Sequence, residues 1–120
     1  MRAVSAFIIM LAASLAATFA HAHGPTRQKA FESITIKASP GAVWDKVGDF
    51  TKLHGWHPAV ESSSATNRSE VGSVRTLNLK GGGQVIETLE SIDPAAKKFS
   101  YRAKDGGALP VTNYSSNMTV

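Results

Sequence analysis

The sequence predicts an α+β domain in which two short helices precede a meander of antiparallel strands. Three observations predict this class. Apolar residues alternate with polar ones over residues 31–38, apolar residues then recur at helical spacing around residues 40–54, and the alternation returns from residue 60 to residue 120. Consecutive alternating segments joined by short turns form hairpins, so we expect one curved antiparallel sheet with the helices gathered at one end.

The first helix is predicted from its start signal and its apolar stripe. Ser39 supplies a capping hydroxyl directly before Pro40, which suits the first position of a helix. The apolar stripe consists of Val43, Trp44, Val47 and Phe50. Gly48 ends this helix, and a second short helix is predicted over Thr51–His54. Pro58 ends that helix because a proline disfavours helical geometry at the residue before it.

Period-two alternation predicts the strands and their faces. The predicted strands cover residues 31–38, 60–64, 74–80, 84–92, 98–104 and 111–120. Gly81–Gly83 is predicted as a hairpin connection, and residues 93–96 as a turn. In the strand over residues 84–92, the alternation places Val85, Glu87 and Leu89 on one face and Ile86, Thr88, Glu90 and Ile92 on the other.

Composition excludes several classes of function. The chain has 120 residues, 13 Lys and Arg against 9 Asp and Glu, and no cysteine. This length fits one domain. The absence of cysteine excludes disulfides, a thiolate nucleophile, cysteine-ligated zinc and iron–sulfur centres. Because the basic residues are scattered rather than clustered, we expect no nucleic-acid partner.

Residues 1–22 read as a secretory signal. Arg2 forms a positive start, residues 3–19 carry no charge, and Ala20-His21-Ala22 fits the small-x-small pattern of a cleavage site. The alternative is a membrane anchor, but the uncharged stretch is at the lower length limit for a span and only weakly apolar. We therefore expect cleavage after Ala22, no membrane span in the mature chain, and a periplasmic or secreted protein. Residues 23–30 would form a flexible leader and residues 31–120 the domain.

Several short motifs resemble a known family. They are residues 38–44 (ASPGAVW), 48–50 (GDF), 56–58 (WHP), 72–77 (GSVRTL), 87–90 (ETLE), 92–93 (ID), 101–102 (YR) and 110–111 (PV), with Tyr114. In this order they resemble the SRPBCC superfamily, the START-like helix-grip group, in its polyketide cyclase/dehydrase branch. The exported form is similar to MxaD-like periplasmic proteins associated with bacterial methanol oxidation.

The resemblance implies a fold and three candidate functions. The fold is a helix-grip, in which a curved sheet grips a long C-terminal helix around a cavity; residues up to Val120 show no counterpart of the final strand and helix, so we expect a truncated C-terminal part. The cavity would bind a hydrophobic or amphipathic small molecule. Alternatively, the protein would assist a periplasmic oxidoreductase of a methanol oxidation system through Lys97, Lys98, Arg102 and Lys104. A third candidate is a cyclase or dehydratase with His57 as base.

Six residues are predicted to bind the ligand, each with a structural alternative. They are Trp56, His57, Arg75, Glu87, Tyr101 and Tyr114. Trp56 and His57 would lie at the cavity mouth, or plug the core edge and cap a turn. Arg75 and Glu87 are near neighbours across the Gly81–Gly83 hairpin; they would anchor a carboxylate or carbonyl, or form an ion pair on the solvent face. The two tyrosines would offer hydroxyls to a ligand, or simply pack.

No catalytic constellation, metal site or cofactor is predicted. His54 and His57 are three residues apart, but Pro58 breaks the helical geometry that would let both hold a metal, and no acidic third ligand lies nearby. Gly81–Gly83 does not precede a helix, so it is a turn rather than a phosphate-binding loop. No Ser/His/Asp order or paired carboxylates stand out.

Overall fold

A computed structural model describes residues 27–120 of the chain. The chain divides into two compact units, residues 1–34 and residues 35–120. In the first unit, the described residues 27–34 contain no helix or strand. The predicted signal segment and its cleavage site lie outside the described residues. No helix within residues 27–120 is long and apolar enough to cross a membrane.

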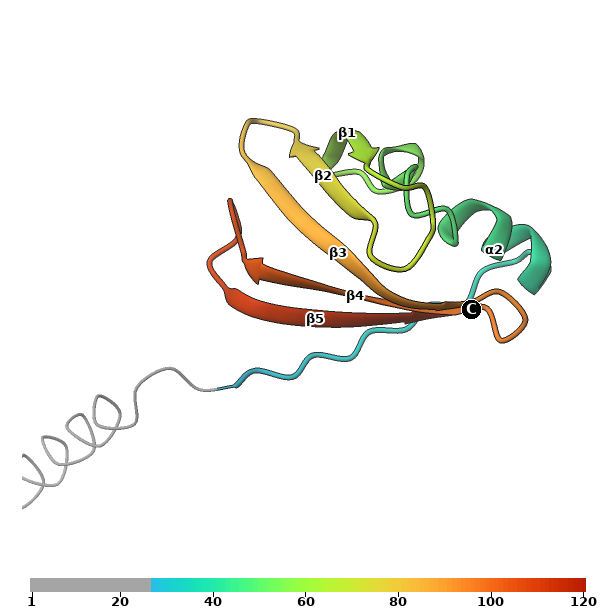
Figure 1. Cartoon of the computed structure of the whole chain (residues 1–120). Helices are drawn as coiled ribbons and strands as arrows, with labels where there is room; N and C mark the ends of the chain where they lie inside the picture. The colour runs from blue at the N-terminus through green and yellow to red at the C-terminus, as the bar shows by residue number, and fades with distance from the viewer. Residues whose placement is uncertain (1–26) are drawn as a thin grey trace, which may run out of the picture. The chain divides into compact units, whose positions relative to one another are not determined.

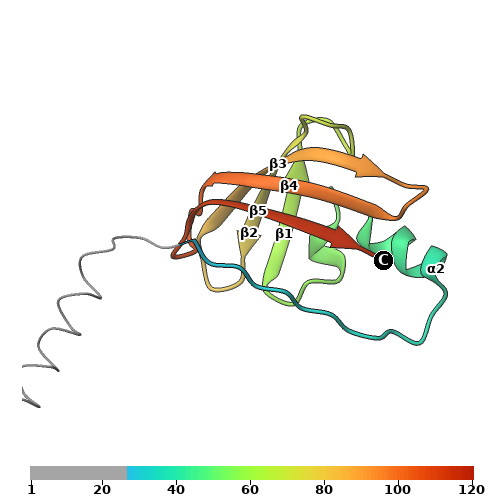
Figure 2. The same ribbon diagram turned by 90° about the horizontal axis from the view of Figure 1, so that it is seen from below.

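The second unit is built on one five-stranded antiparallel sheet (Figure 1). Its strands are β1 (Val60–Ala65), β2 (Val74–Leu79), β3 (Gln84–Asp93), β4 (Lys98–Asp105) and β5 (Thr112–Thr119). The spatial order is β1-β2-β3-β4-β5, so every strand pairs with its neighbours in sequence. This confirms the predicted meander. Figure 2 shows the strands crossing one another at an angle, as expected of a twisted sheet.

The first predicted helix is confirmed, together with both of its end signals. Helix α2 (Pro40–Val47) begins after Ser39, whose hydroxyl accepts a hydrogen bond from the Ala42 amide at 3.2 Å. It ends at Gly48, whose amide donates to the Trp44 carbonyl at 2.8 Å. A Cβ atom at Gly48 would lie 2.6 Å from the Trp44 ring, so only glycine lets this indole fold back over the helix end. Helix α2 lies at the end of the sheet where β3 turns into β4 (Figure 1 and Figure 2).

The predicted second helix over Thr51–His54 is wrong, because only a three-residue 3₁₀ helix, η1 (Leu53–Gly55), forms there. In this segment, side-chain oxygen atoms accept hydrogen bonds from backbone amides. Asp49 Oδ1 accepts hydrogen bonds from the amide and the hydroxyl of Thr51, at 2.9 and 2.6 Å. The Phe50 amide donates to the Ser69 hydroxyl at 3.0 Å. The amides that follow bond three residues back, Lys52 to the Asp49 carbonyl at 3.2 Å and Gly55 to the Lys52 carbonyl at 2.9 Å, which is 3₁₀ rather than α-helical geometry.

The predicted strand over residues 31–38 is also wrong. Residues 31–36 are irregular, and the chain bends at residues 37 and 38. The Ala38 amide donates to the Ile36 carbonyl at 2.9 Å, which closes a tight turn around Lys37 and interrupts the extended run. Alternation specifies a half-buried face but not a pairing partner, and no described residue pairs with this segment.

The inner face of the sheet carries two apolar clusters. The η1 cluster comprises the buried Leu53, Val60, Leu77 and Val85, with Trp56, Leu79 and Tyr114 packed against it. The α2 cluster comprises the buried Phe50, Leu89 and Phe99, with Trp44, Ala65, Ile92, Tyr101 and Met118 packed against it. The outer face carries the exposed Ile86 and polar cross-strand contacts such as Ser91 to Ser100 and Arg102 to Glu90.

Strand β3 follows the predicted faces only up to a register shift. Val85, Glu87 and Leu89 share one face, as predicted, and this is the buried inner face. The pairing with β4 then shifts by one residue between Leu89 and Ser91. This irregularity brings Ile92 to the inner face, where it packs in the α2 cluster, so the prediction that Ile92 shares a face with Ile86, Thr88 and Glu90 is wrong.

Candidate functional site

A charged pair is buried in the middle of the apolar inner face. Arg75 on β2 and Glu87 on β3 are 2% and 4% exposed. They are directly opposite one another in the register, because the hairpin is centred on Gly81 rather than on Gly82. Gly81, Gly82 and Gly83 all have positive φ, a conformation that glycine adopts freely. The pair therefore lies on the inner face and not on the solvent face.

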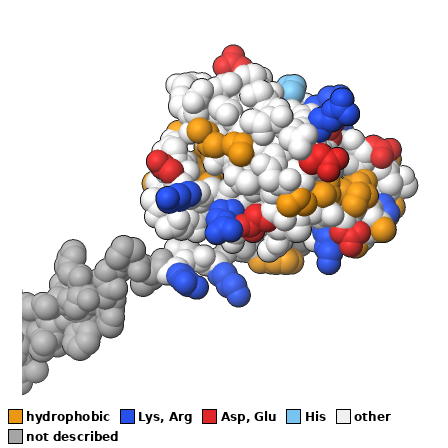
Figure 3. All heavy atoms as spheres, viewed as in Figure 1, with side chains coloured by type: hydrophobic (Ala, Val, Ile, Leu, Met, Phe, Trp, Pro, Cys, Tyr) orange, Lys and Arg blue, Asp and Glu red, His pale blue; other side chains and the backbone are white. Residues whose placement is uncertain are grey.

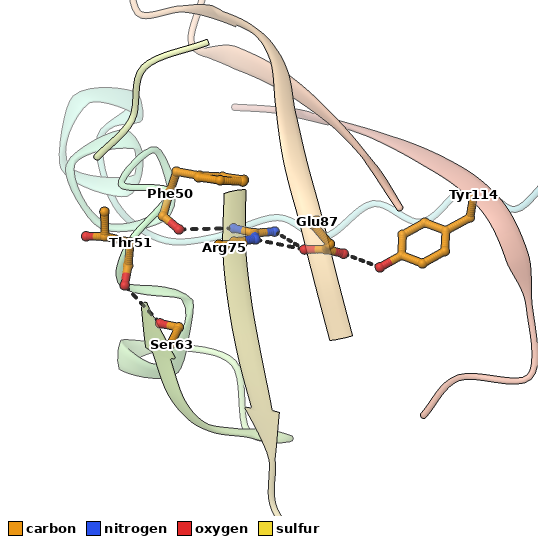
Figure 4. Close-up of polar contacts among 6 residues, drawn as sticks. All are labelled: Phe50, Thr51, Ser63, Arg75, Glu87 and Tyr114. Atoms are coloured by element: carbon orange, nitrogen blue, oxygen red, sulfur yellow. Dashed lines mark hydrogen bonds and ion pairs between the residues drawn. The ribbon is translucent and has the colours of Figure 1, made fainter. Parts of the chain in front are cut away.

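The contacts of Arg75 leave little of its charge uncompensated. Its Nε and Nη2 atoms both donate to Glu87 Oε1 at 2.7 Å, and Nη1 donates to the Phe50 carbonyl at 3.4 Å (Figure 4). Such a pair survives burial only when its hydrogen bonds are satisfied. Because the two charges neutralise each other, neither is free to bind a ligand carboxylate.

Two aromatic rings enclose the Arg75 guanidinium. Its central carbon lies 4.2 Å from the centroid of the Phe50 ring and 4.7 Å from that of the Tyr101 ring. A cation over the face of an aromatic ring is attracted by the ring quadrupole. Tyr101 therefore acts on Arg75 through its ring, and Phe50 contributes both a ring and a carbonyl. The sequence placed Phe50 in the stripe of the first helix and in the motif of residues 48–50, but not at the site.

Tyr114, on β5, adds a third polar side chain to the pair formed by Arg75 and Glu87. Its hydroxyl donates to Glu87 Oε2 (Figure 4). Tyr114 pairs with Ala103 on β4, and Thr88 pairs with Arg102, so the register brings Ala103 beside Glu87. The small side chain of Ala103 lets the tyrosine ring reach over β4, across two strand spacings of about 4.8 Å each. We call Arg75, Glu87 and Tyr114 the inner polar line.

Tyr114 stays a neutral phenol. Burial raises its pKa well above the usual value, and the hydrogen bond and the negative charge of Glu87 raise it further. Its hydroxyl hydrogen already takes part in the hydrogen bond to Glu87, so the hydroxyl oxygen can only accept a further hydrogen bond. The half-buried end of the inner polar line is therefore uncharged and offers an acceptor.

Trp56 and His57 have different surroundings from one another. Trp56 follows η1 and packs against the η1 cluster, which Tyr114 also contacts. Its Nε1 atom is buried and has no hydrogen-bond partner within residues 27–120. His57 Nδ1 accepts a hydrogen bond from the Ala59 amide at 3.1 Å, which closes a turn. His57 contacts the Trp56 ring, with ring centroids 5.9 Å apart, but takes no part in the inner polar line.

The structure thus brings together most of the predicted site residues. Arg75, Glu87, Tyr101 and Tyr114 form one contact network, and Trp56 joins it through the η1 cluster. Phe50 and Ala103 were missed, because their contribution depends on packing and on register across strands. The helical stripe and the Gly48-Asp49-Phe50 motif were the signals for Phe50, and alternation placed Ala103 on the face of Phe99 and Tyr101 without indicating its role beside Glu87.

A separate open pocket lies beside helix α2. It has a volume of about 630 Å³ and is lined by Trp44, Asp45, Gly48, Asp49, Thr51, Arg68, Ser69 and Glu70. None of the six predicted residues lines it. Within residues 27–120, no group of three or more His, Cys, Asp or Glu side chains is placed to hold a metal ion.

Comparison with known protein families agrees with this arrangement. The family model described as "Polyketide cyclase / dehydrase and lipid transport" matches residues 27–120. This range includes the whole sheet, both apolar clusters and the inner polar line. The chain therefore belongs to the polyketide cyclase/dehydrase and lipid transport family of SRPBCC-type proteins.

Proposed function

We propose that the inner face of the sheet binds a hydrophobic or amphipathic small molecule. The family description, which includes lipid transport, supports an apolar ligand. The residues that would contact it are Trp56, Tyr101 and Tyr114. Arg75 and Glu87 hold the tyrosines in place rather than meeting the ligand directly. His57 is assigned no chemical step, because its Nδ1 atom is engaged in a turn.

A gradient of burial along the inner face carries this proposal. The inner residues of β3, Val85, Glu87 and Leu89, are fully buried. On β5 the residues of the same face, Tyr114, Ser116 and Met118, are only half-buried. The inner face thus continues from packed core to accessible surface without losing its aromatic and apolar character. An apolar surface with a few convergent polar groups is typical of small-molecule sites.

Native mass spectrometry of the full chain, purified without detergent, tests this proposal. We expect a discrete noncovalent adduct that disappears under denaturing conditions. Ser116→Trp places an indole on the half-buried inner face and should reduce adduct occupancy several-fold. Ser115→Trp, on the neighbouring exposed position of β5, is the matched control and should leave occupancy unchanged. A wild-type chain that carries no adduct, or equal effects of the two variants, contradicts the proposal.

The second candidate function is a protein-interaction role at the outer face of β4. Lys98 and Lys104 are exposed there, which favours contact with an acidic partner such as a periplasmic oxidoreductase. Arg102 contributes less, because it pairs with Glu90 at 2.5 Å. Acidic and basic side chains are also interspersed on the face that Figure 3 shows. A low-salt pull-down that captures an oxidoreductase with the wild type, but not with K98E/K104E, would support this role.

We also propose that the chain is exported and cleaved after Ala22, which makes it periplasmic or secreted. The support is the charge and residue pattern of residues 1–22. N-terminal sequencing of the protein from its native host should begin at His23. Retention of Met1 in the mature protein would contradict export by this route.

A further inference from the structure

Strand β5 forms one border of the sheet, and within residues 27–120 no strand pairs with its outer edge (Figure 1). The Val120 amide donates to the Lys97 carbonyl at 2.9 Å, so it faces β4. Backbone groups point to alternate sides along a strand, so those of Tyr114, Ser116 and Met118 face β4 as well. The backbone groups of the intervening residues therefore point outward.

The outward-facing amides and carbonyls belong to Ser115, Asn117 and Thr119. An open row of this kind is a template for another strand, and natural sheets usually block it with charged side chains, proline or a bulge. Strand β5 contains no charged residue and no proline. It also keeps one register with β4 along its whole length. This edge is therefore unprotected.

The opposite border of the sheet, β1, is protected. Its pairing with β2 is irregular around the exposed Glu61. Farther along β1, the Ser63 hydroxyl donates to the Thr51 carbonyl at 2.8 Å and contacts His54 Nδ1 at 2.6 Å, which holds the η1 segment against this strand. A bulge, a charge and a covering segment all oppose edge pairing. Among the described strands, only β5 presents a regular open edge.

We propose that two copies of the chain pair through β5, antiparallel and about a two-fold axis at Ser116. This goes beyond the proposed ligand binding and does not depend on it. The outward backbone groups of Ser115 bond to those of the partner's Asn117, and the two-fold axis repeats these bonds. Side chains that lie directly opposite one another share a face, so the inner faces of the two sheets become continuous.

The side chains of β5 suit pairing with an identical strand. Because the strand is uncharged, its antiparallel copy places no like charges opposite one another. Tyr114 lies opposite the partner's Met118, and both residues are half-buried on the inner face. A thioether beside an aromatic ring is a favourable contact. Since Tyr114 packs against the η1 cluster and Met118 against the α2 cluster, pairing joins unlike clusters of the two protomers. A two-fold contact also closes, leaving neither β5 edge open.

Analytical ultracentrifugation of the full chain over a wide range of concentration tests whether this dimer forms. We expect a reversible monomer–dimer equilibrium. S115E/N117E places carboxylates opposite one another at two symmetric positions, whereas S115E/N117K places a carboxylate opposite an ammonium there. The dissociation constant should be roughly tenfold lower for S115E/N117K, since two charge pairs per dimer change sign. Both variants share the carboxylate at position 115, which faces Arg102 on β4.

Ser116→Cys tests the register. The chain has no cysteine of its own, so a disulfide can form only between two copies. The backbone groups of Ser116 face β4 in both protomers, which makes it a non-hydrogen-bonded pair with Cα atoms about 4.5 Å apart, within the range of a disulfide. Mild oxidation should therefore cross-link this variant. Ser64→Cys, at an exposed position of β1, is the matched control and should stay reduced.

Each outcome decides for or against the β5 dimer. Cross-linking of S116C but not of S64C, together with the difference between the charge variants, supports it. A wild-type chain that stays monomeric at every concentration overturns it and leaves the edge to a strand of another protein. A dimer that S116C does not cross-link, or that both charge variants form equally well, uses another surface and also overturns it. The wild type and S116C decide even if a charge variant does not fold. No ligand is involved, so failure here leaves the proposed ligand binding intact.

Discussion

At the scale of single residues, the environment of Arg75 decides how the inner face is held. Among the described residues, Arg75 has the largest side chain that is fully buried. Its burial is tolerated because Glu87, the Phe50 carbonyl and two aromatic rings surround the guanidinium. Each of these contacts compensates part of the cost of removing a charge from water. The pair is thus a positioning device for Tyr114 rather than an open anion site.

Arg75→Met should therefore be strongly destabilising. It leaves the Glu87 carboxylate buried without its counter-ion, which typically costs about 3–5 kcal/mol of the free energy of unfolding. R75M/E87Q removes the unpaired charge and should recover part of that loss. Urea denaturation measures both variants.

The control for this prediction is the exposed ion pair on the outer face. Arg102 pairs with Glu90, but its side chain is 64% exposed. Arg102→Met should change the free energy of unfolding by less than about 1 kcal/mol. If R75M/E87Q is no more stable than Arg75→Met, the cost does not come from an uncompensated charge.

The Tyr114 hydroxyl makes stability depend on alkaline pH. Because its pKa in the folded chain is raised above the unfolded value of about 10, the native state holds this proton more tightly than the unfolded state. The stabilisation is fully present below pH 10 and declines as the pH rises above 10. In a Tyr101→Phe variant Tyr114 is the only tyrosine, so absorbance at 295 nm reports it alone. We expect no phenolate signal near pH 10 while the protein remains folded; ordinary ionisation there would contradict the contact with Glu87.

At the scale of elements, Ala103 on β4 determines whether β5 can contact β3. Ala103 is 1% exposed and pairs with Tyr114. Ala103→Val adds two methyl groups under the path of the tyrosine ring and should break the bond to Glu87. Crowding of this kind costs about 1–3 kcal/mol of the free energy of unfolding. In the Tyr101→Phe background, the pKa of Tyr114 should fall toward 10.

Ala103→Gly is the matched control for that variant. It destabilises the strand without crowding it, so the pKa of Tyr114 should stay raised. If both variants leave the pKa of Tyr114 unchanged, then Ala103 does not control the reach of the ring. If both lower it, strand stability rather than space is the cause.

The strands of the sheet could be predicted from sequence because each depends on local alternation and on nearby turns. Five of the six predicted strands agree with β1 to β5 to within one or two residues at each end. Residues 31–38 fail because a strand also needs a partner, which alternation does not specify. The second helix fails because the backbone there closes i→i−3 bonds, and the Ser69 hydroxyl that binds the Phe50 amide lies far along the chain.

The site could be predicted in part for the same reason. Arg75 and Glu87 flank one short hairpin, so their proximity follows from local sequence. The sharing of one face by Glu87, Val85 and Leu89 also follows from alternation. The roles of Phe50, Ala103 and Tyr114 depend on contacts between distant segments. The register shift at β3 that turns Ile92 inward has no local sequence signal of its own.

At the scale of the whole unit of residues 35–120, the inner polar line lies between two apolar clusters. Tyr114 packs against the η1 cluster, whereas Phe50 and Tyr101, which enclose Arg75, belong to the α2 cluster. The clusters share no buried apolar residue. The polar line is therefore a physical connection between them, in addition to the backbone of the sheet.

This connection predicts that both clusters unfold together. Trp56 packs against the η1 cluster and Trp44 against the α2 cluster, and the chain has no other tryptophan. Trp44→Phe and Trp56→Phe thus give one fluorescence reporter for each cluster. Within each variant, the urea transitions followed by tryptophan fluorescence and by far-UV circular dichroism should coincide, as in a two-state transition. Adding Arg75→Met should separate them, because Glu87 then lacks the partner that ties β3 to Phe50 and Tyr101. Separate transitions with Arg75 intact would mean that the sheet backbone, and not the polar line, sets the cooperativity of this unit.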